Sequence, residues 1–211
     1  MCLRCAITYW RYLHEKILFT PLILAACLVS TGLAAAETPK PAAPMPAEMQ
    51  NMMKAYTPEL RQKVMALSPE LKATIQQLHA AHPRRAKETN LRQIMHEILS
   101  EYQSIASAVA TDNAEQAAEA ARRLAGHRIP KGGLLPYFPL NKVNDNDMAV
   151  LPAMNTAVEG SALKLAEAAD AGNMALAASY MSDIMTGCVA CHQKFRGVPG
   201  NSANLMTPMS K

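Results

Sequence analysis

The chain has 211 residues, of which 50% are hydrophobic and 5% aromatic, and its formal net charge is +4 at pH 7. This charge is small and no basic stripe runs along the chain, which argues against a nucleic-acid-binding protein. Glycine is scarce and no run of alternating β-branched residues occurs, so the composition favours an all-α fold.

The first 36 residues have the pattern of a secretory signal. Arg4, Arg11 and Lys16 precede an apolar run, ILFTPLILAACLVSTGLAAA, which ends in three alanines before Glu37. A basic start, an apolar middle and a small-residue end predict cleavage near Glu37 and export to the periplasm. A retained transmembrane helix is the alternative, because the run is nearly long enough to cross a bilayer, although threonine, serine, glycine and alanine dilute it.

The same segment contains LAAC at 24–27, which resembles the bacterial lipobox. In that case Cys27 would be lipidated and the protein would be tethered to a membrane. Removal of residues 1–36 takes away three basic residues and one acidic residue, which leaves a net charge of +2. It also removes three of the five cysteines, so an exported chain keeps only Cys188 and Cys191.

Two segments of different composition follow the signal. Residues 37–47, ETPKPAAPMPA, form a proline- and alanine-rich linker. Residues 48–86 contain a short repeat, TPELRQKVMAL at 57–67 and SPELKATIQQL at 68–78. Each copy begins with Thr or Ser as a helix N-cap, then Pro, then Glu, which predicts two short helices or one helix kinked at Pro69.

Two histidines close this helical extension. His79 and His82 come just before Pro83. We expect them to be exposed on a solvated, amphipathic appendage, since histidine is more often exposed than bound to a ligand. A metal site or a docking site is the alternative interpretation.

The region 87–198 indicates four amphipathic helices, over about 87–110, 112–126, 147–171 and 173–196. The predicted core seam of the first helix is Leu91, Met95, Ile98, Tyr102, Ile105 and Val109. The second is mainly alanine on its inner side. The predicted inner face of the third is Leu151, Met154, Val158, Ala162, Leu165 and Ala169, and that of the fourth is Ala177, Met181, Ile184, Cys188, Cys191 and Phe195.

The loop between the second and third helices has many large apolar residues and is expected to cover an apolar surface. Residues 199–211 are expected to form a disordered tail.

The fourth predicted helix carries GCVACHQKFR at 187–196. C-x-x-C-H is the pattern in which two thiols bind the vinyl groups of a c-type haem and the histidine binds its iron. A disulfide this local would be strained, a zinc site needs four ligands, and a thioredoxin-like pair needs a βαβ context. We therefore predict one covalent haem c, attached to Cys188 and Cys191, with His192 as the axial iron ligand. On a helix these three side chains project to one side, where a flat macrocycle can lie.

This haem motif, C-x-x-C-H-x-x-[FY]-R at the end of the last of four helices, resembles the cytochrome c-prime family, the class II c-type cytochromes. The resemblance covers about residues 87–198 and leaves 37–86 without a counterpart. It implies an antiparallel four-helix bundle, here with an extra short helical extension. Arg196 lies four residues beyond His192 and could contact a haem propionate, with a favourable charge at the helix C-terminus as the alternative.

In this family the first helix usually faces the other side of the haem, near an Arg-Gln-x-x-Met pattern. This chain has RQIMH at 92–96, which departs from the pattern by one position. Alignment on the Arg-Gln pair puts His96 at the iron, whereas the apolar seam puts Met95 there, and neighbouring helical residues diverge by about 100°. We favour Met95 as the sixth ligand, with a core methionine beside an open site as the alternative. His127 is a third candidate ligand, and Arg92 is a second candidate propionate contact.

Two functions follow from these residues. With a sixth ligand, the protein is a periplasmic mono-haem one-electron carrier, which is the function we favour. Without one, it is a five-coordinate haem protein that binds small gases such as NO or CO, as the resemblance would allow. No carboxylate pair or nucleophile–base set accompanies the motif, so we do not expect an enzyme. The expected partners are redox proteins, without nucleic acid. A homodimer is an alternative to a monomer, and a membrane tether requires a lipidated Cys27.

Overall fold

The structure is a computed structural model that describes residues 47–86 and 90–196. All of these residues belong to one unit of the chain, Ala42–Lys211. The predicted signal segment, the linker up to residue 46 and the predicted tail lie outside the described residues. The described chain is mainly helical, which confirms the all-α prediction. Its strands are the two-residue segments β1 (Arg85–Ala86) and β2 (Ile129–Pro130), which pair in parallel.

The extension contains three short helices, α1 (Ala47–Lys54), α2 (Pro58–Ala66) and α3 (Pro69–Ala80). The side chains of Thr57 and Ser68 accept hydrogen bonds from backbone N–H groups in the first turns of α2 and α3. Of the two predicted alternatives, the structure has two short capped helices and not one helix kinked at Pro69. The repeat did not predict α1, because this helix lacks the Ser/Thr-Pro-Glu start.

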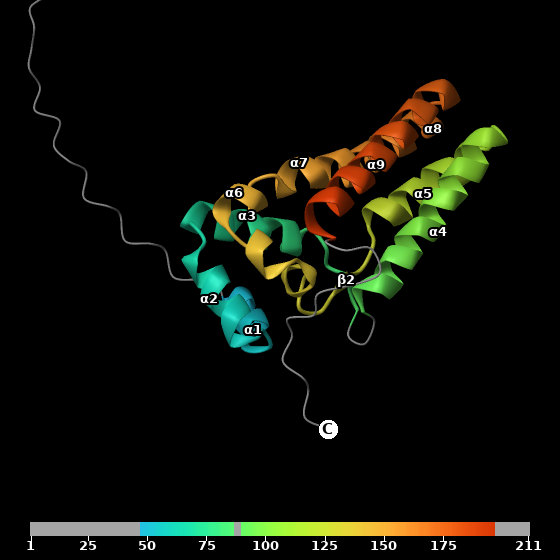
Figure 1. Ribbon diagram of the computed structural model, residues 1–211. Coiled ribbons are helices and arrows are strands. Elements are labelled where there is room, and N and C mark those ends of the chain that lie inside the picture. Colours follow the sequence, from blue (N-terminus) through green and yellow to red (C-terminus); the bar gives the residue numbers. More distant parts are fainter. Residues whose placement is uncertain (1–46, 87–89, 197–211) are drawn as a thin grey trace, which may run out of the picture. The chain divides into compact units, whose positions relative to one another are not determined.

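After the extension, the main helices are α4 (Leu91–Ala110), α5 (Ala114–Ala125), α8 (Ser161–Asp170) and α9 (Met174–Phe195). A capping box of Asn90 and Gln93 begins α4, and asparagine side chains cap α5 and α9. Along the chain, α4 packs against α5, α5 against α8 and α8 against α9, and α9 also contacts α4. The pairs α4–α5 and α8–α9 are seen side by side in Figure 1.

The third helix, predicted over about 147–171, is confirmed over 151–170, but it begins later than predicted because residues 149–150 form a turn. The structure has α6 (Asp145–Met148), α7 (Leu151–Asn155) and a π-helical turn, η3 (Thr156–Gly160), before α8. Pro152 lies in the first turn of α7, where its missing N–H and fixed φ are tolerated and where a continuing helix would be interrupted. The inner face was predicted correctly, since Ala162, Leu165 and Ala169 are buried.

Small residues dominate the first of two hydrophobic clusters in the described chain. It joins α4, α5, α8 and α9, and its buried members are Ile105, Ala108, Ala117, Ala118, Ala120, Ala121, Leu124, Ala162, Leu165, Ala166, Ala168, Ala169, Ala177 and Ile184. Alanine contacts let helices approach closely. Three predicted seam residues of α4, Ile98, Tyr102 and Val109, pack against the cluster, and Ile94, which the seam omitted, is also fully buried.

The second cluster joins the extension to the loop after α5 and to the end of α9. Its buried members are Met49, Met53, Tyr56, Leu60, Val64, Leu67, Leu71, Ile75, Leu135, Phe138, Val143, Met148 and Phe195. The loop forms the 3₁₀ turns η1 (Leu135–Tyr137) and η2 (Leu140–Lys142), and it covers apolar side chains as predicted. Phe138 stacks on Phe195 with ring centroids 4.4 Å apart.

The expectation of exposed histidines on a solvated appendage is wrong. His79 and His82 are each only 7% exposed. The apolar face of α2 and α3 packs into the second cluster, so the polypeptide at the end of α3 is covered by the rest of the unit. The sequence of the extension shows that face, but not what it packs against.

Of the described helices, α9 is long and apolar enough, by length and composition alone, to cross a membrane. The same helix contributes Ala177, Ile184 and Phe195 to the two clusters. Other apolar residues of α9, namely Leu176, Met185 and Val189, are exposed.

Candidate functional site

A mainly apolar cavity lies where the extension, the loop after α5, α4, α7, η3 and α9 meet. Its volume is about 200 Å³, and it opens to solvent on one side. Among its apolar lining residues are Met52, Ile75, Ile98, Leu135, Phe138 and Leu151. Cys188, Cys191 and His192 also line the cavity, so the three residues of the C-x-x-C-H motif border one space that is open to solvent on one side.

The motif lies at the junction of the two hydrophobic clusters. Cys188 packs against the first cluster and Cys191 against the second. Both thiols are free and half-buried, and burial raises the pKa of each. His192 is more exposed. Partial burial and then the positive charge of Arg196 lower the pKa of His192, which favours the neutral imidazole that a metal requires.

Close contacts fix α9 at both sides of the motif. A Cβ added at Gly187 would lie 2.8 Å from Val158 Cγ2 and 3.0 Å from Ala157 Cβ, so only glycine lets α9 approach η3 this closely. At the other side, Lys194 Nζ lies 2.6 Å from Asp147 Oδ1. The hydrogen bond from Lys194 and a second from Asn144 lower the pKa of Asp147 to about 2.

The structure brings some predicted site residues together and leaves others apart. Met95 and His127 line the same cavity as the motif. His96 and Arg92 are exposed on α4 and are not among the cavity-lining residues. Arg196 is exposed and caps α9.

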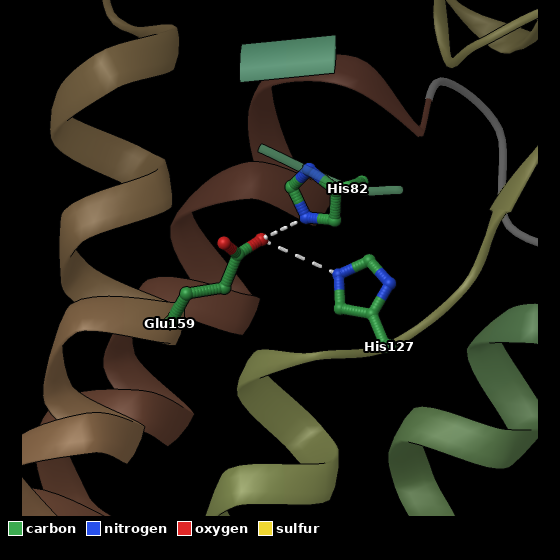
Figure 2. A group of neighbouring side chains, drawn as sticks. All are labelled: His82, His127 and Glu159. Carbon is green, nitrogen blue, oxygen red and sulfur yellow. Dashed lines mark hydrogen bonds and ion pairs between the residues drawn. The ribbon is translucent and has the colours of Figure 1, made fainter. Parts of the chain in front are cut away.

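Three further polar side chains meet inside the cavity, as Figure 2 shows. His82 Nε2 lies 2.7 Å and His127 Nε2 lies 3.4 Å from the same carboxylate oxygen, Glu159 Oε1. The hydrogen bond to Glu159 raises the pKa of His82, although burial opposes it. Burial raises the pKa of Glu159, but hydrogen bonds from His127 and His82 outweigh it, so the pKa is lowered and the carboxylate is charged.

Sequence reasoning did not find this group as a unit. His82 and Glu159 are 77 residues apart, and Glu159 belongs to no motif. The π-helical turn that carries Glu159 left no signal in the apolar periodicity. His127 was singled out only as a candidate iron ligand.

His79 also lines the cavity, with its two ring nitrogens in different surroundings. Its Nδ1 lies 3.1 Å from Arg85 Nη2 and 3.3 Å from Glu48 Oε1. Its Nε2 is buried and has no hydrogen-bond partner among the described residues. Burial, followed by the charge of Arg85, lowers the pKa of His79, so the ring is neutral near pH 7.

Comparisons with known proteins found no match to this chain: no family model, no curated protein and no solved structure matches it.

Proposed function

We propose that the protein is a c-type cytochrome, which holds one covalent haem in this cavity and carries single electrons. The observation that supports it is that Cys188, Cys191 and His192, on one helix, line one mainly apolar cavity. Attachment of haem c requires two thiols and an imidazole of this spacing beside an apolar space. The Fe³⁺/Fe²⁺ couple would come from the haem, and the axial ligand and the surrounding polarity from the chain.

The surroundings of the motif suit a haem. Both thiols are free, and the lining beyond them consists mostly of methionine, leucine, isoleucine and aromatic side chains. Burial in such a lining lowers the local dielectric and limits the access of water to a bound iron, which are two of the means by which a protein sets a redox potential. The lowered pKa of His192 keeps its ring neutral for ligation.

The helix contacts support the finer fold proposal of a cytochrome c-prime-like bundle. In an antiparallel four-helix bundle each helix packs against two neighbours around a shared core. The contacts of α4 with α5, α5 with α8, α8 with α9 and α9 with α4 form such a circuit. Export to the periplasm belongs to the same proposal, because thioether attachment of haem requires export.

An electron carrier is favoured over a gas-binding protein because ligating side chains share the cavity with His192. Met95 lines it, as do His79, His82 and His127. The Nε2 atoms of His82 and His127 both face Glu159, so the thioether of Met95 is the ligand that we favour for the sixth position. A six-coordinate, low-spin iron changes its ligand set little on reduction and is suited to electron transfer.

The first test is the attachment of haem. Protein produced with a haem-ligation system should keep its haem colour after denaturing extraction with acid and organic solvent. Its mass should exceed that of the chain beginning at Glu37 by one haem, because two thioether bonds survive denaturation. Cys188→Ala with Cys191→Ala should abolish this retention, whereas Met185→Ala on the exposed side of α9 should not change it. Complete loss of colour on extraction of the unaltered protein would overturn the proposal.

A further inference from the structure

His82, His127 and Glu159 reach one point from three separate segments (Figure 2). His82 follows α3, His127 follows α5, and Glu159 belongs to the π-helical turn η3. Their ligand atoms all lie within 4.8 Å of one another. A π-helical turn shifts side chains relative to a regular helix and occurs frequently at functional sites. Here it presents a carboxylate to two imidazoles.

The two rings are oriented alike by backbone carbonyl groups. His82 Nδ1 lies 2.8 Å from the carbonyl oxygen of Leu78, and His127 Nδ1 lies 2.7 Å from that of Arg128. Each Nδ1–H therefore donates to a carbonyl, and each Nε2 is directed at the carboxylate. This is the arrangement of metal-binding histidines, in which a second partner on the far nitrogen fixes the ring and the tautomer.

The three side chains are also nearly enclosed. The exposed fractions of the side chains alone are 8% for His82, 14% for His127 and 16% for Glu159. Two imidazoles that share one carboxylate oxygen in such a place need a positive charge between them, carried either by ring protons or by a metal ion. Ligand atoms bound to tetrahedral Zn²⁺ at about 2.0–2.1 Å are roughly 3.3 Å apart, close to the 3.4 Å between His127 Nε2 and Glu159 Oε1. His82 Nε2 lies 2.7 Å from the same oxygen, which is a hydrogen-bond distance, so this pair would have to move apart by about 0.6 Å when a metal ion binds.

We propose that Nε2 of His82, Nε2 of His127 and the carboxylate of Glu159 bind one divalent metal ion of the zinc class. Two imidazoles and a carboxylate are a ligand set that Zn²⁺ accepts in proteins, and three protein ligands leave a fourth tetrahedral position for water. Ca²⁺ and Mg²⁺ prefer sites made of oxygen atoms and are not expected to compete.

This metal site does not rest on the proposed haem. It uses none of Cys188, Cys191 and His192, although these residues line the same cavity. Free thiols can themselves bind zinc, so the two sources of binding must be separated in the experiment.

Isothermal titration of chelator-treated protein with ZnCl₂, with metal content measured after gel filtration, tests the proposal. We expect one Zn²⁺ per chain. Glu159→Gln, which keeps the shape of the side chain, should weaken binding by more than about 100-fold, since loss of an outer-shell partner alone costs about 10–100-fold. His82→Asn and His127→Asn should do the same. His96→Asn is the matched control, because His96 is exposed on α4 outside the cavity, and it should bind zinc as the unaltered protein does.

A second arm uses the chain with both Cys188→Ala and Cys191→Ala, which cannot attach haem. It should keep the zinc affinity of the unaltered chain, so failure of the haem proposal and failure of the metal proposal give different results. Circular dichroism verifies the helical content of each variant. Unchanged zinc binding by folded Glu159→Gln, or binding that disappears only when the cysteines are replaced, would overturn the metal site.

Discussion

Four histidines of the described chain line the cavity, and the neighbours of their ring nitrogens differ between His79 and the pair His82 and His127. The Nε2 atoms of His82 and His127 face Glu159, whereas the Nε2 of His79 faces no hydrogen-bond partner among the described residues. Arg85 donates to Nδ1 of His79, which places the ring proton on Nε2. Ligation through Nε2 would require this proton to move to Nδ1, where Glu48 could accept a hydrogen bond. The thioether of Met95 needs no such transfer.

Absorption spectra of single variants test the proposal that Met95 is the sixth iron ligand. If Met95 is the ligand, the ferric protein should be low-spin, with the weak far-red absorption typical of iron–thioether ligation, and the ferrous protein should resist CO. Met95→Ala should then give a high-spin spectrum and CO binding. His96→Ala should leave the spectrum unchanged, because His96 is exposed outside the cavity.

Other outcomes of this series have definite meanings. Loss of the low-spin signal only in His79→Ala or only in His127→Ala would identify a histidine as the ligand and reject Met95. A high-spin spectrum in the unaltered protein would contradict the electron-carrier function and favour the gas-binding alternative. Absorption spectra of the ferric, ferrous and CO-treated forms are sufficient to distinguish these cases.

Among the elements, the contact between α9 and η3 sets the positions of the C-x-x-C-H motif and of Glu159 together. Gly187 directly precedes Cys188, and its Cα approaches Ala157 and Val158 too closely for a side chain. The same turn, η3, carries Glu159 into the cavity. A shift of α9 away from η3 would therefore move both candidate sites.

Gly187→Ala should lower the free energy of unfolding by up to about 2 kcal/mol. Overpacking costs about 1–3 kcal/mol, which outweighs the gain of about 1 kcal/mol in helix propensity from glycine to alanine. Chemical denaturation followed by circular dichroism measures the change. In a Val158→Ala background the same substitution should cost less, because the nearest atom, Val158 Cγ2, is then absent. An equal cost in both backgrounds would show that the contact with Val158 is not the cause.

In the described unit as a whole, the extension and α9, the helix that carries the C-x-x-C-H motif, share one hydrophobic cluster. Leu60 of α2 and Phe195 of α9 both belong to it, with Phe138 of the loop stacked on Phe195. Tyr56 adds a polar link, because its hydroxyl donates a 2.7 Å hydrogen bond to the carbonyl of Gly132. Burial of Tyr56 raises the pKa of this phenol, so the hydroxyl keeps its proton.

Leu60→Ala should lower the stability of the unit by about 2–5 kcal/mol, since a fully buried leucine leaves a cavity when it is truncated. Met65→Ala on the same helix is the control. Met65 is 56% exposed, and its replacement should change stability by no more than about 0.5 kcal/mol. Thermal unfolding of Leu60→Ala should shift as one transition, because the cluster connects α2 to α9. A separate early transition, with the remainder unfolding at the unaltered temperature, would show that the extension unfolds independently.

Short-range features of the fold could be predicted from the sequence. The caps at Thr57 and Ser68 and the inner faces of α8 and α9 depend on neighbours within a few residues, and the structure has them as predicted. The C-x-x-C-H spacing is equally local, so it predicts haem attachment without reference to the rest of the chain, and that prediction awaits its experiment.

The tertiary structure decided what depends on contacts between distant segments. His82 is buried because α2 and α3 pack their apolar faces into the second cluster, and it meets Glu159 across 77 residues of sequence. The π-helical turn η3 lies within the predicted third helix and places Glu159 at the cavity, which periodicity cannot show because a π turn shifts the register of the side chains. Burial is a property of packed surfaces, whereas the sequence of one segment specifies only its own apolar face. The sequence therefore determined which residues could bind a cofactor, and the packing of distant segments determined which of them share a cavity.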